Sequence, residues 1–229
     1  MNTLQRAAFL AAAAACMYAS ADPVWSYFPE GDAWYNVLSN NAAREQGTVE
    51  GRIGNRLNIG TWELGIWRVH DIGPFLALGQ LEWFNGVAAP FSIVYDGSRG
   101  VSFSLGTSTI TTTELGGTFT DIFIRTRSAT FGDVDLSSMR LFTASGELPI
   151  GDLASMGAGD VEYIRIENMG QRFGAFELRG QMKLTWLASD PPINSQVNAQ
   201  FRFTNVPSPA SLAALAPLAL RPRRRAFRV

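Results

Sequence analysis

Histidine, the side chain most used for acid–base catalysis and zinc binding, occurs once in this chain, as His70 beside Asp71. A serine–histidine–aspartate triad and most zinc sites would need such a residue. The sequence contains neither a G-x-S-x-G nor an H-E-x-x-H motif, and its single cysteine is Cys16, close to the N-terminus. We therefore interpret His70 as a strand-end residue bonded to a neighbour, and we predict no catalytic triad and no zinc site.

Two glutamates lie among tryptophans, Glu63 in TWELGIW and Glu82 in LEWF. Glycoside hydrolysis needs two carboxylates on either side of a sugar-binding cleft, and aromatic rings can stack on sugars. Strand alternation by itself also places each glutamate on the face opposite its neighbouring tryptophan. We expect core tryptophans with outward glutamates. A sugar-binding face is the alternative, and a catalytic pair is the third possibility; the sugar-binding face would use Trp62, Trp67 and Trp83.

Several aspartates in expected loops offer oxygen ligands for calcium: Asp96, Asp133, Asp135 and Asp152. No twelve-residue EF-hand loop surrounds any of them, and aspartate next to glycine is usually a turn former. Calcium binding is kept as an alternative, and no metal or cofactor site is predicted.

Arg125 and Arg127 are two residues apart in TDIFIRTR, so both project from one face of a strand. We expect them to form ion pairs with the many acids of the domain, with an anionic sugar as the alternative partner. Residues 22–205 hold all 20 acidic residues but only 13 of the 19 basic ones, a net charge of −7. This acidic balance argues against nucleic acid as a partner, because phosphate binding needs a positive surface.

Short runs with a period of two fill the middle of the chain, which predicts strands. The clearest hairpin is Pro90–Leu105, where two alternating runs flank the turn residues DGSRG. Thr120–Arg127 has three consecutive apolar residues, as a central strand would, and Asp32–Gln46 is the best helix candidate. The other expected strands are Thr48–Ile53, Thr61–Val69, Leu76–Phe84, Thr109–Thr113 (exposed), Val134–Phe142, Leu148–Ile150, Val161–Ile166, Ala175–Leu187 and Val197–Phe203.

About ten short strands with glycine-rich turns predict an all-β fold, an antiparallel β-sandwich or jelly-roll-like single domain over residues 22–205. Terminal helical signal and sorting segments are expected to flank it. The domain would contain no cysteine, so it would depend on its hydrophobic core rather than on disulfides.

Residues 1–21 have the features of a secretory signal peptide. Arg6 supplies the positive charge, residues 7–15 form an uncharged apolar run, and Ala19-Ser20-Ala21 is an A-x-A cleavage site. Ala19 and Ala21 are the recognition residues of this site, and cleavage after Ala21 would leave Asp22 as the first residue. A lipoprotein modified at Cys16 is the alternative.

Residues 206–229 have three parts, which are a short proline motif, an apolar segment and an arginine cluster. Apolar residues partition into lipid, and terminal arginines hold the end on the cytoplasmic side. The pattern therefore predicts a C-terminal sorting or membrane-retention signal. The motif residues are Val206, Pro207, Ser208 and Pro209, and the cluster contains Arg223, Arg224 and Arg225.

This tail resembles the PEP-CTERM sorting signal, which implies recognition by the export machinery and processing by a membrane protease. The segments WFNG at 83–86, PFSIVYDGSRGVSFSLG at 90–106 and TDIFIRTRS at 120–128 resemble the choice-of-anchor W domain, with the best likeness over residues 58–190. Together these resemblances imply a secreted or cell-surface protein with a transient membrane tether. We expect a non-enzymatic surface or matrix protein, with extracellular polysaccharide as the expected partner. A lectin-like sugar-binding module is the alternative, and a glycan hydrolase or lyase is less favoured.

Overall fold

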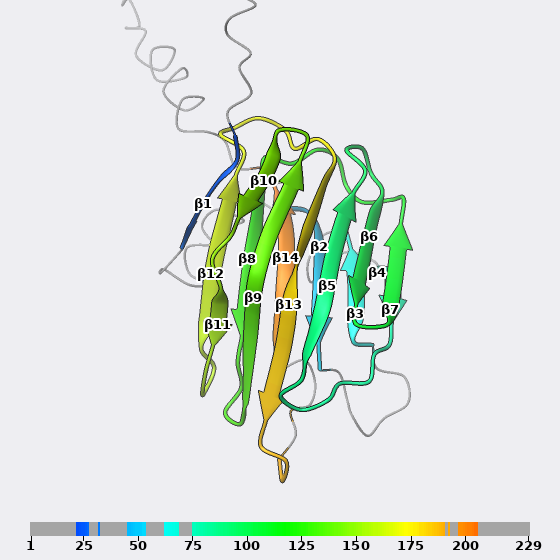
Figure 1. The fold of residues 1–229 in the computed structure, drawn as a ribbon. Coiled ribbons are helices and arrows are strands. Elements are labelled where there is room, and N and C mark those ends of the chain that lie inside the picture. The colour runs from blue at the N-terminus through cyan, green and yellow to red at the C-terminus, as the bar shows by residue number, and fades with distance from the viewer. Residues whose placement is uncertain are drawn as a thin grey trace, which may run out of the picture.

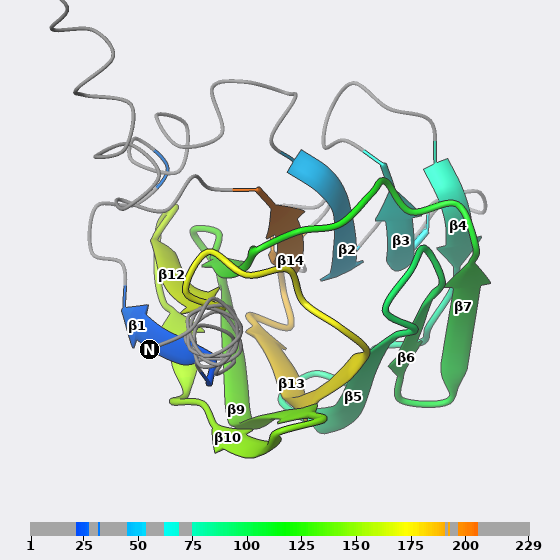
Figure 2. The same ribbon diagram turned by 90° about the horizontal axis from the view of Figure 1, so that it is seen from above.

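The computed structural model describes residues 22–27, 32, 45–53, 62–68, 75–190, 192 and 197–205, and they form two stacked sheets (Figures 1 and 2). The first sheet has, in spatial order, β1 (Val24–Tyr27), β12 (Val161–Glu167), β8 (Asp121–Arg127), β14 (Asn198–Thr204), β2 (Glu45–Arg52), β3 (Leu64–Trp67) and β4 (Phe75–Gly79). The second has β10 (Gly146–Pro149), β9 (Gly132–Thr143), β13 (Phe176–Trp186), β5 (Ala88–Tyr95), β6 (Val101–Leu105) and β7 (Ser108–Thr112), with β11 (Leu153–Ser155) paired to β9.

Every named strand pair is antiparallel, so the predicted antiparallel β-sandwich is confirmed. β8 lies between β12 and β14, which confirms it as a central strand. The predicted hairpin is β5 and β6, and the Asp96 carboxylate caps its turn by accepting hydrogen bonds from the backbone N–H groups of Ser98 and Arg99. Gly97 in this turn has a φ of 84°, a conformation that glycine adopts without strain.

The core fills the space between the sheets, and β13 shows why the sequence predicts it well. Every second side chain of this strand is buried, and the buried ones include Leu178, Met182 and Leu184. Aromatic rings form the centre of the core at one end. Phe119 packs within 4.8–6.0 Å of four other rings, measured between centroids: Tyr95, Phe173, Phe176 and Phe203.

Two predicted elements need correction. The strand expected over Leu76–Phe84 ends at Gly79, because the chain then leaves the first sheet and crosses to the second. The helix expected over Asp32–Gln46 is wrong at its C-terminal end, where β2 begins at Glu45; residues 33–44 lie outside the described residues. Within the described residues, no helix is both long and apolar enough to cross a membrane.

The sequence did not predict β1 and β11, which are only four and three residues long. β1 nevertheless joins the two sheets at one edge of the sandwich. It pairs with β12, while the Trp25 indole donates a hydrogen bond to the Pro149 carbonyl at 2.8 Å and the Tyr27 hydroxyl donates to the Asp152 carbonyl at 2.7 Å. The first strand after the predicted cleavage site is therefore part of the folded domain.

The chain enters and leaves the first sheet at the same end of the sandwich. Val24, the first residue of β1, pairs with Glu167, which pairs with Asp121, which in turn pairs with Thr204, the last residue of β14. These residues form one row across four neighbouring strands. Three strand spacings correspond to about 14 Å, so the start of β1 and the end of β14 lie at one end of the domain (Figure 1).

Candidate functional site

Trp62 and Trp67 lie together with Phe75 near the β3–β4 edge of the first sheet. The three ring centroids are 5.2–5.7 Å apart, and all three pairs meet edge to face. The Trp67 side chain is buried on the face of the sheet that points away from the core, whereas Phe75 is 52% exposed. The guanidinium carbon of Arg52 lies 3.3 Å from the centroid of Trp62, so one face of that ring is already covered. Phe75 is therefore the most accessible ring of the group.

Trp83 lies apart from these rings and packs against the core from the connection between β4 and β5. Its indole N–H donates a hydrogen bond to the Arg52 carbonyl at 2.9 Å. The three tryptophans named in the sequence thus do not form one surface, although all of them are tied to the β2–β3 region.

Glu63 and Glu82 have different surroundings. Burial raises the pKa of the half-buried Glu63, while a hydrogen bond from the Leu81 backbone and the charge of Arg52 oppose the rise. Glu82 is exposed, as the sequence predicted. The Leu81 contact places the Glu63 carboxylate close to the chain beside Glu82, but neither carboxylate lines the pocket between β4 and β7 that is described below.

The aspartates considered for calcium make ordinary structural contacts. Asp133 and Asp152 accept hydrogen bonds from the backbone N–H groups of Gly157 and Ser138, and Asp135 forms an ion pair with Lys183 at 2.8 Å. In the described part of the chain, no group of three or more histidine, cysteine, aspartate or glutamate side chains could hold a metal ion.

Other predicted site residues lie outside the described residues. They are His70 with Asp71, the cleavage residues Ala19 and Ala21, and the sorting residues Val206, Pro207, Ser208, Pro209, Arg223, Arg224 and Arg225.

The ion-pair interpretation of Arg125 is confirmed. Its guanidinium donates two hydrogen bonds to the Asp32 carboxylate, at 2.9 and 3.0 Å, and the same carboxylate accepts the Tyr163 hydroxyl at 2.5 Å. Burial would raise the pKa of Asp32, but the hydrogen bonds from Arg125 and Tyr163 outweigh it and lower that pKa. Arg127, two residues further along β8, is exposed.

Glu50 is a buried carboxyl that the sequence did not predict; among the described residues Asp121 and Arg202 are also buried. It lies on β2 on the outer face of the first sheet and is only 3% exposed, with the Gln200 amide donating a hydrogen bond to it at 3.1 Å. Burial raises the pKa of Glu50 to about 7, despite the opposing charges of Arg52 and Arg202. Alternation with Val49 predicts only that Glu50 points away from the core; burial on the outer face depends on the tertiary structure.

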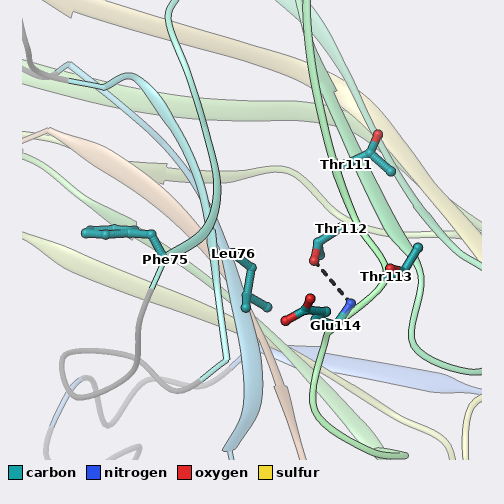
Figure 3. Close-up of a pocket in the computed structure, with 6 residues that line it drawn as sticks. All are labelled: Phe75, Leu76, Thr111, Thr112, Thr113 and Glu114. Carbon is teal, nitrogen blue, oxygen red and sulfur yellow. Dashed lines mark hydrogen bonds between the residues drawn. The ribbon is translucent and has the colours of Figure 1, made fainter.

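A pocket of about 360 Å³ lies between β4 and β7, the edge strands of the two sheets (Figure 3). The two edges are in contact near the end of β4 and the start of β7, where the Ser108 hydroxyl donates to the Gln80 carbonyl at 2.5 Å. A β-carbon placed on Gly79 would lie 2.6 Å from Ile110, so the glycine permits this close approach. The pocket is lined by Phe75, Leu76, Thr111, Thr112, Thr113 and Glu114.

The walls of this pocket differ in chemistry. Figure 3 shows the Leu76 and Glu114 side chains pointing toward one another, while the Phe75 ring points away to the outside. The Glu114 side chain is 70% exposed and lies 3.9 Å from the Arg68 guanidinium, and Arg68 also donates hydrogen bonds to the Glu114 carbonyl. An apolar wall that faces hydroxyl and carboxylate acceptors can bind a small polar molecule with an apolar face.

Comparison with known proteins does not assign the chain to a family, because no protein-family model and no curated protein sequence matches it.

Proposed function

We propose that this protein is an exported, non-enzymatic component of the bacterial cell surface or extracellular matrix, delivered by its leader and sorted by its C-terminal tail. The observation that carries the proposal is the pairing of an Arg6-led signal sequence with a proline–apolar–arginine tail around an acidic domain without cysteine. The PEP-CTERM-like pattern of the tail accounts for the sorting step.

The arrangement of the domain is compatible with this route. Because β1 begins at Val24 and β14 ends at Thr204 in one row of the sheet, a tail held in a membrane would keep this end of the domain near that membrane. The opposite end of the sandwich would then face outward. That outer end carries several exposed apolar side chains, among them Phe84, Phe131 and Leu187.

Intact mass of the protein recovered from cells and medium tests the proposal. We expect loss of residues 1–21 in every exported molecule and loss of the arginine cluster in molecules released from the membrane. Replacing Arg223, Arg224 and Arg225 with alanine should prevent the second cleavage. Replacing Arg179, an exposed arginine on β13, should leave it unchanged. Full-length protein in the cytosol with both ends intact would refute the proposal.

A lectin-like module is the second candidate function, and the β4–β7 pocket is the observation that favours it. A glycan hydrolase has less support, because Glu63 and Glu82 are not brought to this pocket. Glycan cleavage that disappears in both Glu63→Gln and Glu82→Gln would establish the hydrolase instead.

A further inference from the structure

The β4–β7 pocket combines features that suit a sugar better than an ion or a lipid. Leu76 supplies an apolar wall that can contact the C–H face of a pyranose ring. Glu114, opposite, is an acceptor-only group with two oxygens, and it can accept hydrogen bonds from two neighbouring hydroxyls. The volume of the pocket, about 360 Å³, is near the lower end of the range of roughly 300–1,000 Å³ for small-ligand sites. This size suits a mono- or disaccharide.

Glu114 is held at the pocket by its backbone, and its carboxylate is largely exposed. The Thr112 hydroxyl accepts the backbone N–H of Glu114 at 3.1 Å and so fixes the chain at this point. Thr113 is exposed at the pocket, next to the carboxylate. The ion pair with Arg68 spans 3.9 Å between side chains that are 44% and 70% exposed, so it holds the carboxylate only weakly.

We propose that this pocket binds a neutral sugar unit of an extracellular polysaccharide, with Glu114 accepting hydrogen bonds from adjacent hydroxyls and Leu76 contacting the ring. Access to that polysaccharide rests on the proposed export of the protein. A uronic acid is disfavoured, because its carboxylate would meet Glu114 on a domain whose net charge is −7. Phe75 also lines the pocket and is 52% exposed, so a second sugar unit can stack on its ring, and oligosaccharides should bind more tightly than monosaccharides.

Isothermal titration of the purified full-length protein provides the test. The probes are cello-, manno- and xylo-hexaose as neutral oligosaccharides and hexaguluronate as the anionic one. We expect saturable binding of at least one neutral hexaose and none of hexaguluronate. Glu114→Gln should weaken that binding at least about tenfold, because a charged acceptor forms stronger hydrogen bonds than a neutral amide.

Matched variants separate the pocket from general surface effects. Glu147→Gln changes a glutamate on β10, at the far edge of the second sheet, and should leave affinity unchanged. Thr113→Val should weaken binding, whereas Thr109→Val, an exposed threonine of β7 that does not line the pocket, should not.

The proposal is overturned if no neutral hexaose binds, if hexaguluronate binds more tightly than all of them, or if Glu114→Gln and Thr113→Val bind as the wild type does. These results come from purified protein and do not depend on delivery. Correct processing without sugar binding would therefore reject only the proposal that the pocket binds sugar. Sugar binding by a protein retained in the cytosol would reject only the proposed export.

Discussion

Replacing Glu50 with glutamine should make the protein more stable at alkaline pH and should leave its stability almost unchanged in mild acid. The wild-type carboxyl is 3% exposed, and its pKa is raised to about 7 from an ordinary value of 4.5, chiefly by burial. A glutamine in its place keeps a carbonyl oxygen that can accept the Gln200 amide hydrogen bond, and it never carries a charge.

The size of the effect follows from the difference in proton binding between the two states. Below about pH 4.5, Glu50 is protonated in both the folded and the unfolded protein, so it causes no pH dependence. Between about 4.5 and 7 the folded protein keeps a proton that the unfolded chain releases, so the wild type loses stability as pH rises. The difference of about 2.5 in pKa corresponds to about 3 kcal/mol, all of it lost above pH 7.

Urea denaturation of wild type and Glu50→Gln from pH 4.5 to 8.5 measures this directly. Subtracting one free energy of unfolding from the other removes the contributions of groups common to both. We expect the difference to be within about 1 kcal/mol at pH 4.5 and to rise to about 3 kcal/mol in favour of the variant above pH 7, or roughly 6–12 °C in melting temperature for a domain of this size.

Glu147→Gln, which alters an exposed ion pair, is the control and should give a small difference with no such rise. A Glu50→Gln difference that stays constant from pH 4.5 to 8.5 would refute the reasoning, because it would mean that Glu50 ionises equally easily in both states.

Three further predictions concern the framework of the domain. Asp32→Ala should lower the free energy of unfolding at pH 7 by about 2 kcal/mol, as measured by urea denaturation, because it leaves the buried Arg125 guanidinium without its carboxylate partner. It should also reduce the loss of stability on acidification toward pH 3, because the partners of Asp32 lower its pKa in the wild type. Phe119→Ala should cost about 3–5 kcal/mol, and Phe131→Ala, at an exposed phenylalanine, should cost less than about 1 kcal/mol in the same measurement. Gly97→Ala should lower the melting temperature measurably, because φ is 84° at this position and the added β-carbon would lie 2.9 Å from the backbone nitrogen of Ala175. Gly174→Ala is the control and should leave the melting temperature unchanged, because its β-carbon would enter open space.

The sequence pattern predicted best those strands that have one buried face and one solvent-exposed face. β13 is such a strand, and its buried side chains fall at every second position. The pattern failed over Leu76–Phe84, where apolar residues continue after the strand has ended. Leu81 and Trp83 pack against the core from a connection between the sheets, and hydrophobicity cannot distinguish that from a strand. β1 was missed because four residues are too few to show a period.

For the candidate sites, too, residue types indicated the kind of interaction, and only the fold identified the partners. Residue types indicated that Arg125 would form an ion pair, but only the fold brings Asp32, 93 positions away in the chain, to its guanidinium. The tryptophans seen as one sugar-binding face occupy two separate places, and the β4–β7 pocket joins residues 75–76 with 111–114. No spacing in the chain predicts a contact between the edge strands of two different sheets.

The sequence by itself determined the all-β class, most of the strands, the hairpin at Asp96–Gly100 and the acidic charge of the domain, because alternation, turn chemistry and charge are local properties. Only the tertiary structure decided which polar groups are buried, which edges meet and that the start of β1 and the end of β14 lie at one end of the sandwich. Burial and pairing depend on residues distant in the chain. A glutamate such as Glu50 therefore acquires its raised pKa from packing that no local pattern records.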